Sequence, residues 1–236
     1  SLDNPSTPGG GALPGGIGWY RKTFTLPETD RGKVVYVDFD GVYRNSEVWI
    51  NGHSLGFRPN GYVSFRYDLT PYLRYGSQPN VIVVKADNSE QPNSRWYSGS
   101  GIYRNVWLVK VNPVHVDNWG TFVHDMRISP EEATFSLEVR IRNSSEADRE
   151  AEVSTSIYDD RNKVVTASVT TLLRVPYTPC YDTRMREASV DHQFSIPNPK
   201  LWSPDSPSLY TAVTEVKVDG RVVDRYETVF GLRTFR

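Results

Sequence analysis

The sequence predicts an all-β protein built from two antiparallel β-sandwiches. Apolar and polar residues alternate with a period of two along most of the chain, and residues 135–141 are the clearest example. Two dipeptides, Asn51-Gly52 and Asp219-Gly220, each join a pair of such segments and favour a type I′ hairpin turn. Because the predicted strands follow one another without intervening helices, a parallel α/β fold is excluded.

The first half of the chain is expected to form one sandwich. Its alternating segments predict strands at 19–25, 35–39, 47–50, 62–67, 81–86 and 105–111. The only helical signal lies at 68–73, where Asp68 or Thr70 can cap and Pro71 suits a first turn, so a short helix or 3₁₀ turn is expected. Residues 1–16 are rich in glycine, proline and serine, and we expect them to form an extended arm.

The second half is expected to form the other sandwich. Its predicted strands lie at 121–128, 135–141, 152–158, 164–172, 189–196, 209–218 and 222–230. Pro113 has no N–H to donate to a strand ladder, and a new set of alternating segments follows it. We therefore place a domain boundary there, with domains at 1–112 and 113–236, each near the roughly 100 residues of a common sandwich domain.

Composition excludes several classes of protein. The 236 residues carry 27 Lys and Arg against 28 Asp and Glu, without the basic excess of a nucleic-acid binder. This charge balance predicts no nucleic-acid partner. No apolar run approaches the ~18 residues of a membrane span, so no membrane span is expected either. Cys180 is the single cysteine, which excludes an intramolecular disulfide and leaves both periplasm and cytoplasm open. The start at Ser1, with no methionine and no apolar signal core, is typical of a trimmed N-terminus, which leaves open whether a signal peptide preceded it.

One motif resembles a catalytic signature. Residues 52–56 spell Gly-His-Ser-Leu-Gly, which fits the G-x-S-x-G nucleophile elbow of α/β-hydrolases. That elbow needs a helix after the serine, whereas residues 57–61 (Phe-Arg-Pro-Asn-Gly) cannot form one. We therefore interpret the run as a hairpin turn followed by a strand.

No metal or cofactor site is expected. The four histidines, His53, His115, His124 and His192, are scattered, and none has the i, i+4 or H-x-H spacing of a metal site. The glycine-rich runs near the N-terminus are not followed by a helix, so they do not fit a phosphate-binding loop.

The segment 87–101 is the candidate functional loop. Its 15 residues form a long connection for a compact sandwich, and such loops usually carry function. Arg95-Trp96-Tyr97 combines forked donors with flat aromatic faces that suit a sugar ring. The alternative is that Trp96 plugs the end of the sandwich while Arg95 makes an internal ion pair, and these residues alone leave both interpretations open.

Several short runs follow one another in a recognisable order. In the first half they are 18–24 (Gly-Trp-Tyr-Arg-Lys-Thr-Phe), 48–52 (Val-Trp-Ile-Asn-Gly), 68–70 (Asp-Leu-Thr) and 94–108, which opens on Ser-Arg-Trp-Tyr. In the second half they are 198–204 (Asn-Pro-Lys-Leu-Trp-Ser-Pro) and 230–233 (Phe-Gly-Leu-Arg). Together these runs resemble the sugar-binding domain and the immunoglobulin-like domain of glycoside hydrolase family 2, and the resemblance covers nearly the whole chain.

The resemblance implies a jelly-roll-type sandwich followed by an immunoglobulin-like sandwich, both preceding a (β/α)₈ barrel. Members of the family are exo-acting, retaining β-glycosidases that act on terminal β-linked sugars, and their catalytic glutamates lie in the barrel. A barrel needs about 250 residues of alternating strands and helices, which this chain lacks. We therefore expect a β-galactosidase-like parent enzyme, with a homo-oligomer of that parent left open, and an inactive fragment. The alternative is an autonomous two-domain carbohydrate-binding module or adhesin.

The resemblance also implies substrate-binding residues. In family β-galactosidases the loop before the tryptophan of this run offers an acidic residue to the sugar and to a sodium ion. Here Ser94 stands at the matching position, followed by Arg95 and Trp96, with no carboxylate. We expect these three residues to bind substrate without a metal, and Arg95 to meet a sugar hydroxyl or a uronic acid carboxylate. The sequence does not distinguish a galactoside from a glucuronide or a mannoside as the substrate.

Overall fold

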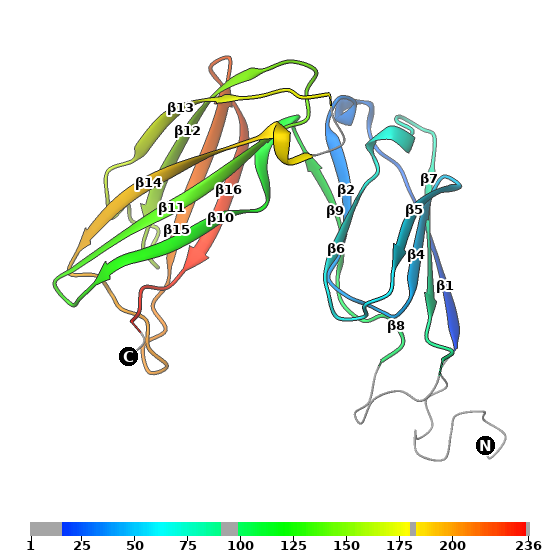
Figure 1. Ribbon diagram of the computed structural model, residues 1–236, viewed down its shortest axis with the longest axis horizontal. Coiled ribbons are helices and arrows are strands. Elements are labelled where there is room, and N and C mark those ends of the chain that lie inside the picture. The colour runs from blue at the N-terminus through cyan, green and yellow to red at the C-terminus, as the bar shows by residue number, and fades with distance from the viewer. Residues whose placement is uncertain (1–15, 91–98, 180–182, 235–236) are drawn as a thin grey trace, which may run out of the picture. The chain divides into compact units, whose positions relative to one another are not determined.

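The structure is a computed structural model that describes residues 16–90, 99–179 and 183–234 (Figure 1). The chain divides into two compact units, residues 1–110 and 111–236. Nearly all regular structure in both is antiparallel β-sheet, so the predicted all-β sandwich class is confirmed. No helix in the described part of the chain is long and apolar enough to cross a membrane.

The first unit contains two main sheets that face one another (Figure 1). One has the order β1-β7-β4-β5 and contains β1 (Ile17–Phe24), β7 (Asn80–Asp87), β4 (Ser46–Ile50) and β5 (His53–Arg58). The other has the order β6-β2-β9 and contains β6 (Phe65–Asp68), β2 (Val34–Phe39) and β9 (Val106–Val111). The short strands β3 (Val42–Tyr43) and β8 (Gly101–Ile102) pair with each other, and the 3₁₀ turns are η1 (Glu28–Asp30) and η2 (Thr70–Tyr72).

Strand alternation explains the core of this unit. In β4, Val48 and Ile50 are fully buried, whereas Trp49 between them faces outward and is only partly covered. Because successive side chains of a strand point to opposite faces, one face of each sheet supplies the core and the other is left for solvent or a partner. Phe39 and Leu69 complete the core of the first unit, and each exposes no more than 1% of its surface to solvent.

The second unit also packs two sheets against each other (Figure 1). The sheet β10-β11-β14 contains β10 (Val114–Ile128), β11 (Glu132–Asn143) and β14 (Glu187–Pro197), which follows the 3₁₀ turn η3 (Thr183–Arg186). The sheet β13-β12-β15-β16 contains β13 (Val169–Val175), β12 (Arg149–Tyr158), β15 (Tyr210–Val218) and β16 (Arg221–Phe230). Phe135 lies at the centre of this core, with ring centroids 5.5 Å from Phe194 and 5.2 Å from Phe230.

A row of polar side chains is buried within this second core. His192 is fully buried, and its two ring nitrogens lie 3.0 Å from Thr155 Oγ1 and 3.2 Å from Thr171 Oγ1. Thr155 Oγ1 in turn lies 2.9 Å from Thr214 Oγ1. Each polar group therefore has a partner, which removes the cost of burying it.

Local turn signals were the most accurate part of the sequence prediction. Both hairpin turns are confirmed, since Asn51 and Gly52 have φ of 50° and 87° and Asp219 and Gly220 have φ of 51° and 73°. The short 3₁₀ turn is also confirmed, and Asp68 Oδ1 accepts the N–H of Thr70 at 2.8 Å.

The predicted strand 164–172 was wrong at its start. Val164 forms only an isolated bridge with Tyr158, and β13 begins at Val169. The turn at 159–163 does bring the chain back, because Asp159 Oδ1 accepts the N–H groups of Arg161 and Lys163, and Val165 donates its N–H to the carbonyl of Ile157. The pairing is then interrupted, and the ladder resumes in a shifted register where Val169 lies opposite Thr155. The predicted strand 62–67 likewise begins later, at Phe65, because Tyr62 and Val63 donate their N–H groups to Asn60 Oδ1 in a turn.

Acidification should destabilise the chain through its buried histidines. Burial lowers the pKa of both His192 and His115 from their ordinary value, so the unfolded chain takes up protons first as the pH falls. Their contribution to stability is complete above about pH 6.5 and is lost as the pH falls below that value. The melting temperature should therefore fall between about pH 7.5 and pH 5.5, and His192→Gln should make this fall shallower. Equal slopes for the two proteins would contradict this account.

Candidate functional site

The three predicted substrate-binding residues, Ser94, Arg95 and Trp96, lie outside the described residues. The structure does describe both ends of the segment that carries them, at 87–90 and 99–101. These ends form the base of the candidate loop, and their contacts decide where the loop leaves the sandwich.

Asn88 ties the two ends of the loop together. Its side chain is 1% exposed, and its Nδ2 donates to Ser100 Oγ at 2.8 Å. Its backbone N–H donates to the carbonyl of Gly16 at 2.9 Å, directly before β1. One buried amide therefore closes the loop across 12 residues and ties it to the entry of the first strand.

Arg44 holds the outgoing end of the loop. Its guanidinium Nη2 donates to the carbonyl of Glu90 at 3.0 Å and lies 3.6 Å from the Glu90 carboxylate. Its own carbonyl accepts the N–H of Asp87 at 2.9 Å, and Asn45 Nδ2 donates to the carbonyl of Asp87 at 3.3 Å. Arg44 and Asn45 both lie in the connection between β3 and β4, so a second segment of the fold fixes the loop base.

Asp87 contributes a carboxylate at this base. Ser89 donates both its hydroxyl, at 2.6 Å, and its N–H, at 3.1 Å, to Asp87 Oδ1, and Lys85 Nζ lies 3.7 Å from Oδ2. The Ser89 hydrogen bonds, with the lysine, hold the pKa of the Asp87 carboxyl below its ordinary value. Asp87 is therefore ionised at neutral pH and shapes the turn by accepting hydrogen bonds.

Gly101 ends the loop in a position that strongly favours glycine. Its φ is 89°, in the left-handed region, and a Cβ placed there would lie 1.9 Å from the hydroxyl of Tyr20. Glycine is favoured here both by the backbone and by the close approach of the tyrosine. The start of the family-like run at 101–108 is thus fixed against β1.

The remainder of that run also contacts the sandwich directly. Tyr103 donates its hydroxyl to the carbonyl of Gly61 at 2.9 Å, and a Cβ at Gly41 would lie 2.6 Å from the Tyr103 ring. Trp107 donates its indole N–H to Asp40 Oδ2 at 3.0 Å. Residues 101–107 therefore have structural partners that their sequence pattern did not identify.

The other candidates from the sequence are accounted for structurally. Ser54 of the G-x-S-x-G run lies in β5 after the Asn51-Gly52 turn, with no helix following, so the interpretation as a hairpin is confirmed. Within the described residues no group of three or more His, Cys, Asp or Glu side chains could hold a metal ion.

Two motifs of the second unit contact each other. The N–H of Trp202 donates to the carbonyl of Leu232 at 2.8 Å, and the guanidinium of Arg233 lies 4.8 Å from the centre of the Trp202 ring. A Cβ at Gly231 would come within 3.1 Å of Trp202. The runs 198–204 and 230–233 are therefore one structural element that secures the end of β16.

Comparison with known families matches both units. The model for the sugar binding domain of glycosyl hydrolases family 2 matches residues 10–112, and a second model of glycosyl hydrolases family 2 matches residues 121–233. The fold and these matches define the chain as paired β-sandwich domains from a family of glycosidases. The chain belongs to glycoside hydrolase family 2.

The proteins that resemble this chain are named as β-galactosidases or as β-glucuronidases. The chain is 47% identical to a β-galactosidase, BoGH2A, of Bacteroides ovatus, with 100% of this chain and 27% of that protein covered. It is 39% identical to a putative β-glucuronidase of Formosa agariphila, covering 96% of this chain and 20% of that protein. A β-glycosidase structure from Bacteroides vulgatus superposes with a TM-score of 0.82 at 39% identity, covering 99% of this chain and 28% of that one. The chain thus spans about a quarter of the length of these relatives.

Alanine at position 101 should destabilise the first unit more than alanine at position 52. The two glycines have nearly the same φ, 89° and 87°, but a Cβ at Gly52 meets open space. Gly52→Ala should cost about 1 kcal/mol from backbone strain alone, and Gly101→Ala about 1–3 kcal/mol more from the collision with Tyr20. Denaturant unfolding measures both, and adding Tyr20→Phe should recover part of the Gly101→Ala loss. Equal costs at the two positions would show that Tyr20 does not constrain the loop end.

Proposed function

We propose that this chain forms the non-catalytic β-sandwich part of a retaining β-glycosidase, a β-galactosidase, whose (β/α)₈ barrel carries the catalytic carboxylates. The observation that carries the proposal is the match of both units to family 2 domains in a chain that spans 27% of a β-galactosidase relative. It is supported by the absence of strand–helix alternation in the described residues, whose only helices are three short 3₁₀ turns.

The proposed role of the chain is to present the 87–101 loop to the substrate. Asn88, Arg44 and Gly101 fix where the loop leaves and rejoins the sandwich, which leaves the segment between them to form one wall of a pocket completed by the barrel. Preorganised supports of this kind lower the entropy that a loop loses when it meets a ligand. Within this segment we assign substrate contact to Ser94, Arg95 and Trp96.

Arg95 provides the chemistry for polar recognition. A guanidinium presents forked donors to a hydroxyl pair or a carboxylate, and the similarity to both β-galactosidases and β-glucuronidases fits either partner. Because Ser94 has no carboxylate, it does not supply the acidic ligand of the family's sodium site, and we assign no metal to this sugar contact. Trp96 would stack on the sugar ring or close the end of the sandwich behind it.

The isolated chain should have no glycosidase activity. Retaining hydrolysis requires two carboxyl groups about 5–5.5 Å apart across the sugar. Chromogenic β-galactoside, β-glucuronide and β-mannoside should therefore all survive prolonged incubation with the chain. Turnover that disappears when one of the chain's own carboxylates is replaced would contradict the proposal and favour an autonomous enzyme.

In the full-length protein, Arg95→Ala should lower kcat/KM for the preferred glycoside by at least about tenfold, the value of a lost charge-assisted hydrogen bond. Its stability should stay within about 0.5 kcal/mol of the parent, as for a surface change. Arg161→Ala, at an exposed arginine in a turn of the second unit, is the matched control and should change neither.

The same measurements on Arg95→Ala and Trp96→Ala also test the alternative in which these residues have a structural role. If Arg95→Ala lowers the melting temperature and leaves kcat/KM intact, Arg95 is an ion-pair residue of the sandwich. Trp96→Ala should lower stability as well as kcat/KM only if its ring also closes the sandwich end. Comparing β-galactoside with β-glucuronide in the same assays identifies which sugar Arg95 recognises.

A further inference from the structure

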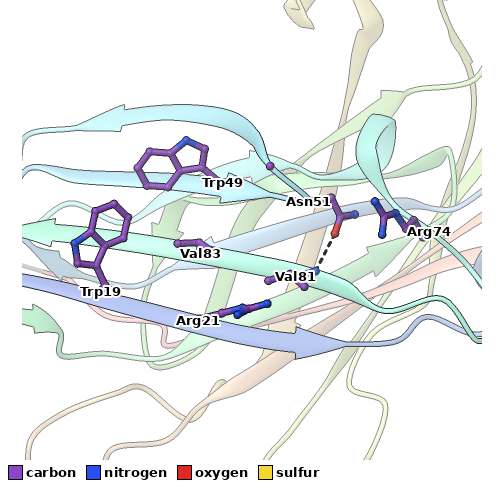
Figure 2. Close-up of a pocket in the computed structure, with 8 residues that line it drawn as sticks. Trp19, Arg21, Trp49, Asn51, Arg74, Val81 and Val83 are labelled. Atoms are coloured by element: carbon purple, nitrogen blue, oxygen red, sulfur yellow. Dashed lines mark hydrogen bonds between the residues drawn. The ribbon is translucent and has the colours of Figure 1, made fainter.

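The outer face of the sheet β1-β7-β4-β5 carries two tryptophans that lie side by side (Figure 2). The ring centroids of Trp19 and Trp49 are 5.7 Å apart, and their planes differ by 25°. Trp19 is 63% exposed, so most of its ring is open to solvent. Exposure of so large an apolar side chain next to a second tryptophan is typical of a binding surface.

Strand register explains why these rings meet. β1 and β4 both pair with β7, and Val83 lies between Arg21 and Trp49, while Lys85 lies between Trp19 and Glu47. The side chains of these positions therefore share one face. This arrangement is part of the sheet itself, because β7 pairs with β1 at eight positions and with β4 at five, so strands and not a loop hold the two rings.

The groove beside the rings is positively charged. It is lined by Trp19, Arg21, Trp49, Asn51, Arg74 and two valines, and no carboxylate is among them. The guanidinium groups of Arg21 and Arg74 make no ion pair with any described residue. The carboxylate on the neighbouring row, Glu47, is already paired with Lys85 at 3.1 Å.

Asparagines fix the position of Arg74. Asn80 accepts the N–H of Arg74 and donates to its carbonyl, both at 2.8 Å. Asn51 donates to Asn80 Oδ1 at 2.9 Å and accepts the N–H of Val81 at 2.8 Å, the contact drawn in Figure 2. Since Asn80 is fully buried, the backbone that carries Arg74 is held rigidly at the edge of the groove.

We propose that this face, defined as Trp19, Trp49, Arg21 and Arg74, is a binding site for an acidic saccharide with carboxylate groups. The indole faces suit the apolar face of a pyranose ring, and two guanidinium groups that form no ion pair within the described part of the chain suit the carboxylates of uronic acid units. A neutral glycan would leave both arginines without a partner. The proposal concerns binding by this chain alone and does not depend on the proposed catalytic role of the parent protein.

The test is calorimetric titration of the 236-residue chain with two β-1,4-linked tetrasaccharides that differ only at C6. One is tetraglucuronate, and the other is cellotetraose. Tetraglucuronate should bind at least about tenfold more tightly, because only it can pair with the arginines. Its affinity should fall as NaCl is raised from about 0.05 M to about 0.5 M, which screens those pairs.

Variants locate the site. Trp19→Ala should weaken tetraglucuronate binding by about tenfold, and Trp19→Phe should restore part of the affinity because it keeps an aromatic face. Replacing Arg21 and Arg74 together with glutamine should abolish the preference for tetraglucuronate. Trp119→Ala removes a tryptophan that is 72% exposed in the second unit, and this matched control should bind as the parent chain does.

Three outcomes would overturn the proposal. They are no binding of tetraglucuronate, equal binding of the two tetrasaccharides, and unchanged binding by Trp19→Ala with circular dichroism matching the parent. Self-association that Trp19→Ala removes, measured by sedimentation in the absence of bound saccharide, would assign the face to a second copy of the chain instead.

Discussion

Burial of one face of every sheet is the constraint on which the rest of this structure depends. Because the sequence has a single cysteine and few helical residues, packing between paired sheets has to stabilise both sandwiches. In β4 this requirement turns Val48 and Ile50 inward, and the pleat then turns Trp49 outward. The residues available to a ligand are thus decided by the residues that the core needs.

The same constraint explains why the base of the 87–101 loop carries hydrogen-bond partners of its own. A sandwich end exposes backbone groups that no neighbouring strand satisfies, so a long connection there needs its own partners. Asn88 and Arg44 supply those partners, since each reaches a backbone or side-chain group on a different segment. A loop supported at both ends can present a short polar and aromatic run at a defined place. That is the property a glycosidase would require of a domain that lies outside its barrel.

Fold class and turns could be predicted from the sequence because their signals are local. The dipeptide Asn51-Gly52 by itself predicts the positive φ angles of its turn, and the alternation of apolar and polar residues predicts which face of a strand is buried. The loop supports could not be predicted in the same way, because Arg44 and Glu90 are 46 positions apart and meet only once the β3–β8 pairing is known. The contact between Trp19 and Trp49 could not be predicted either, although both residues lie in runs that resemble the family. Their contact follows from the strand order, which places β7 between β1 and β4, and no local pattern encodes that order.

We propose that this chain contributes residues to a glycosidase pocket whose catalytic carboxylates lie in the barrel. A crystal structure of the full-length protein with a non-hydrolysed substrate analogue bound tests this proposal. We expect Arg95 within hydrogen-bond distance, about 2.7–3.2 Å, of a sugar oxygen, and both catalytic carboxylates on the barrel. A bound sugar with no contact to any residue between Asn88 and Gly101 would contradict it.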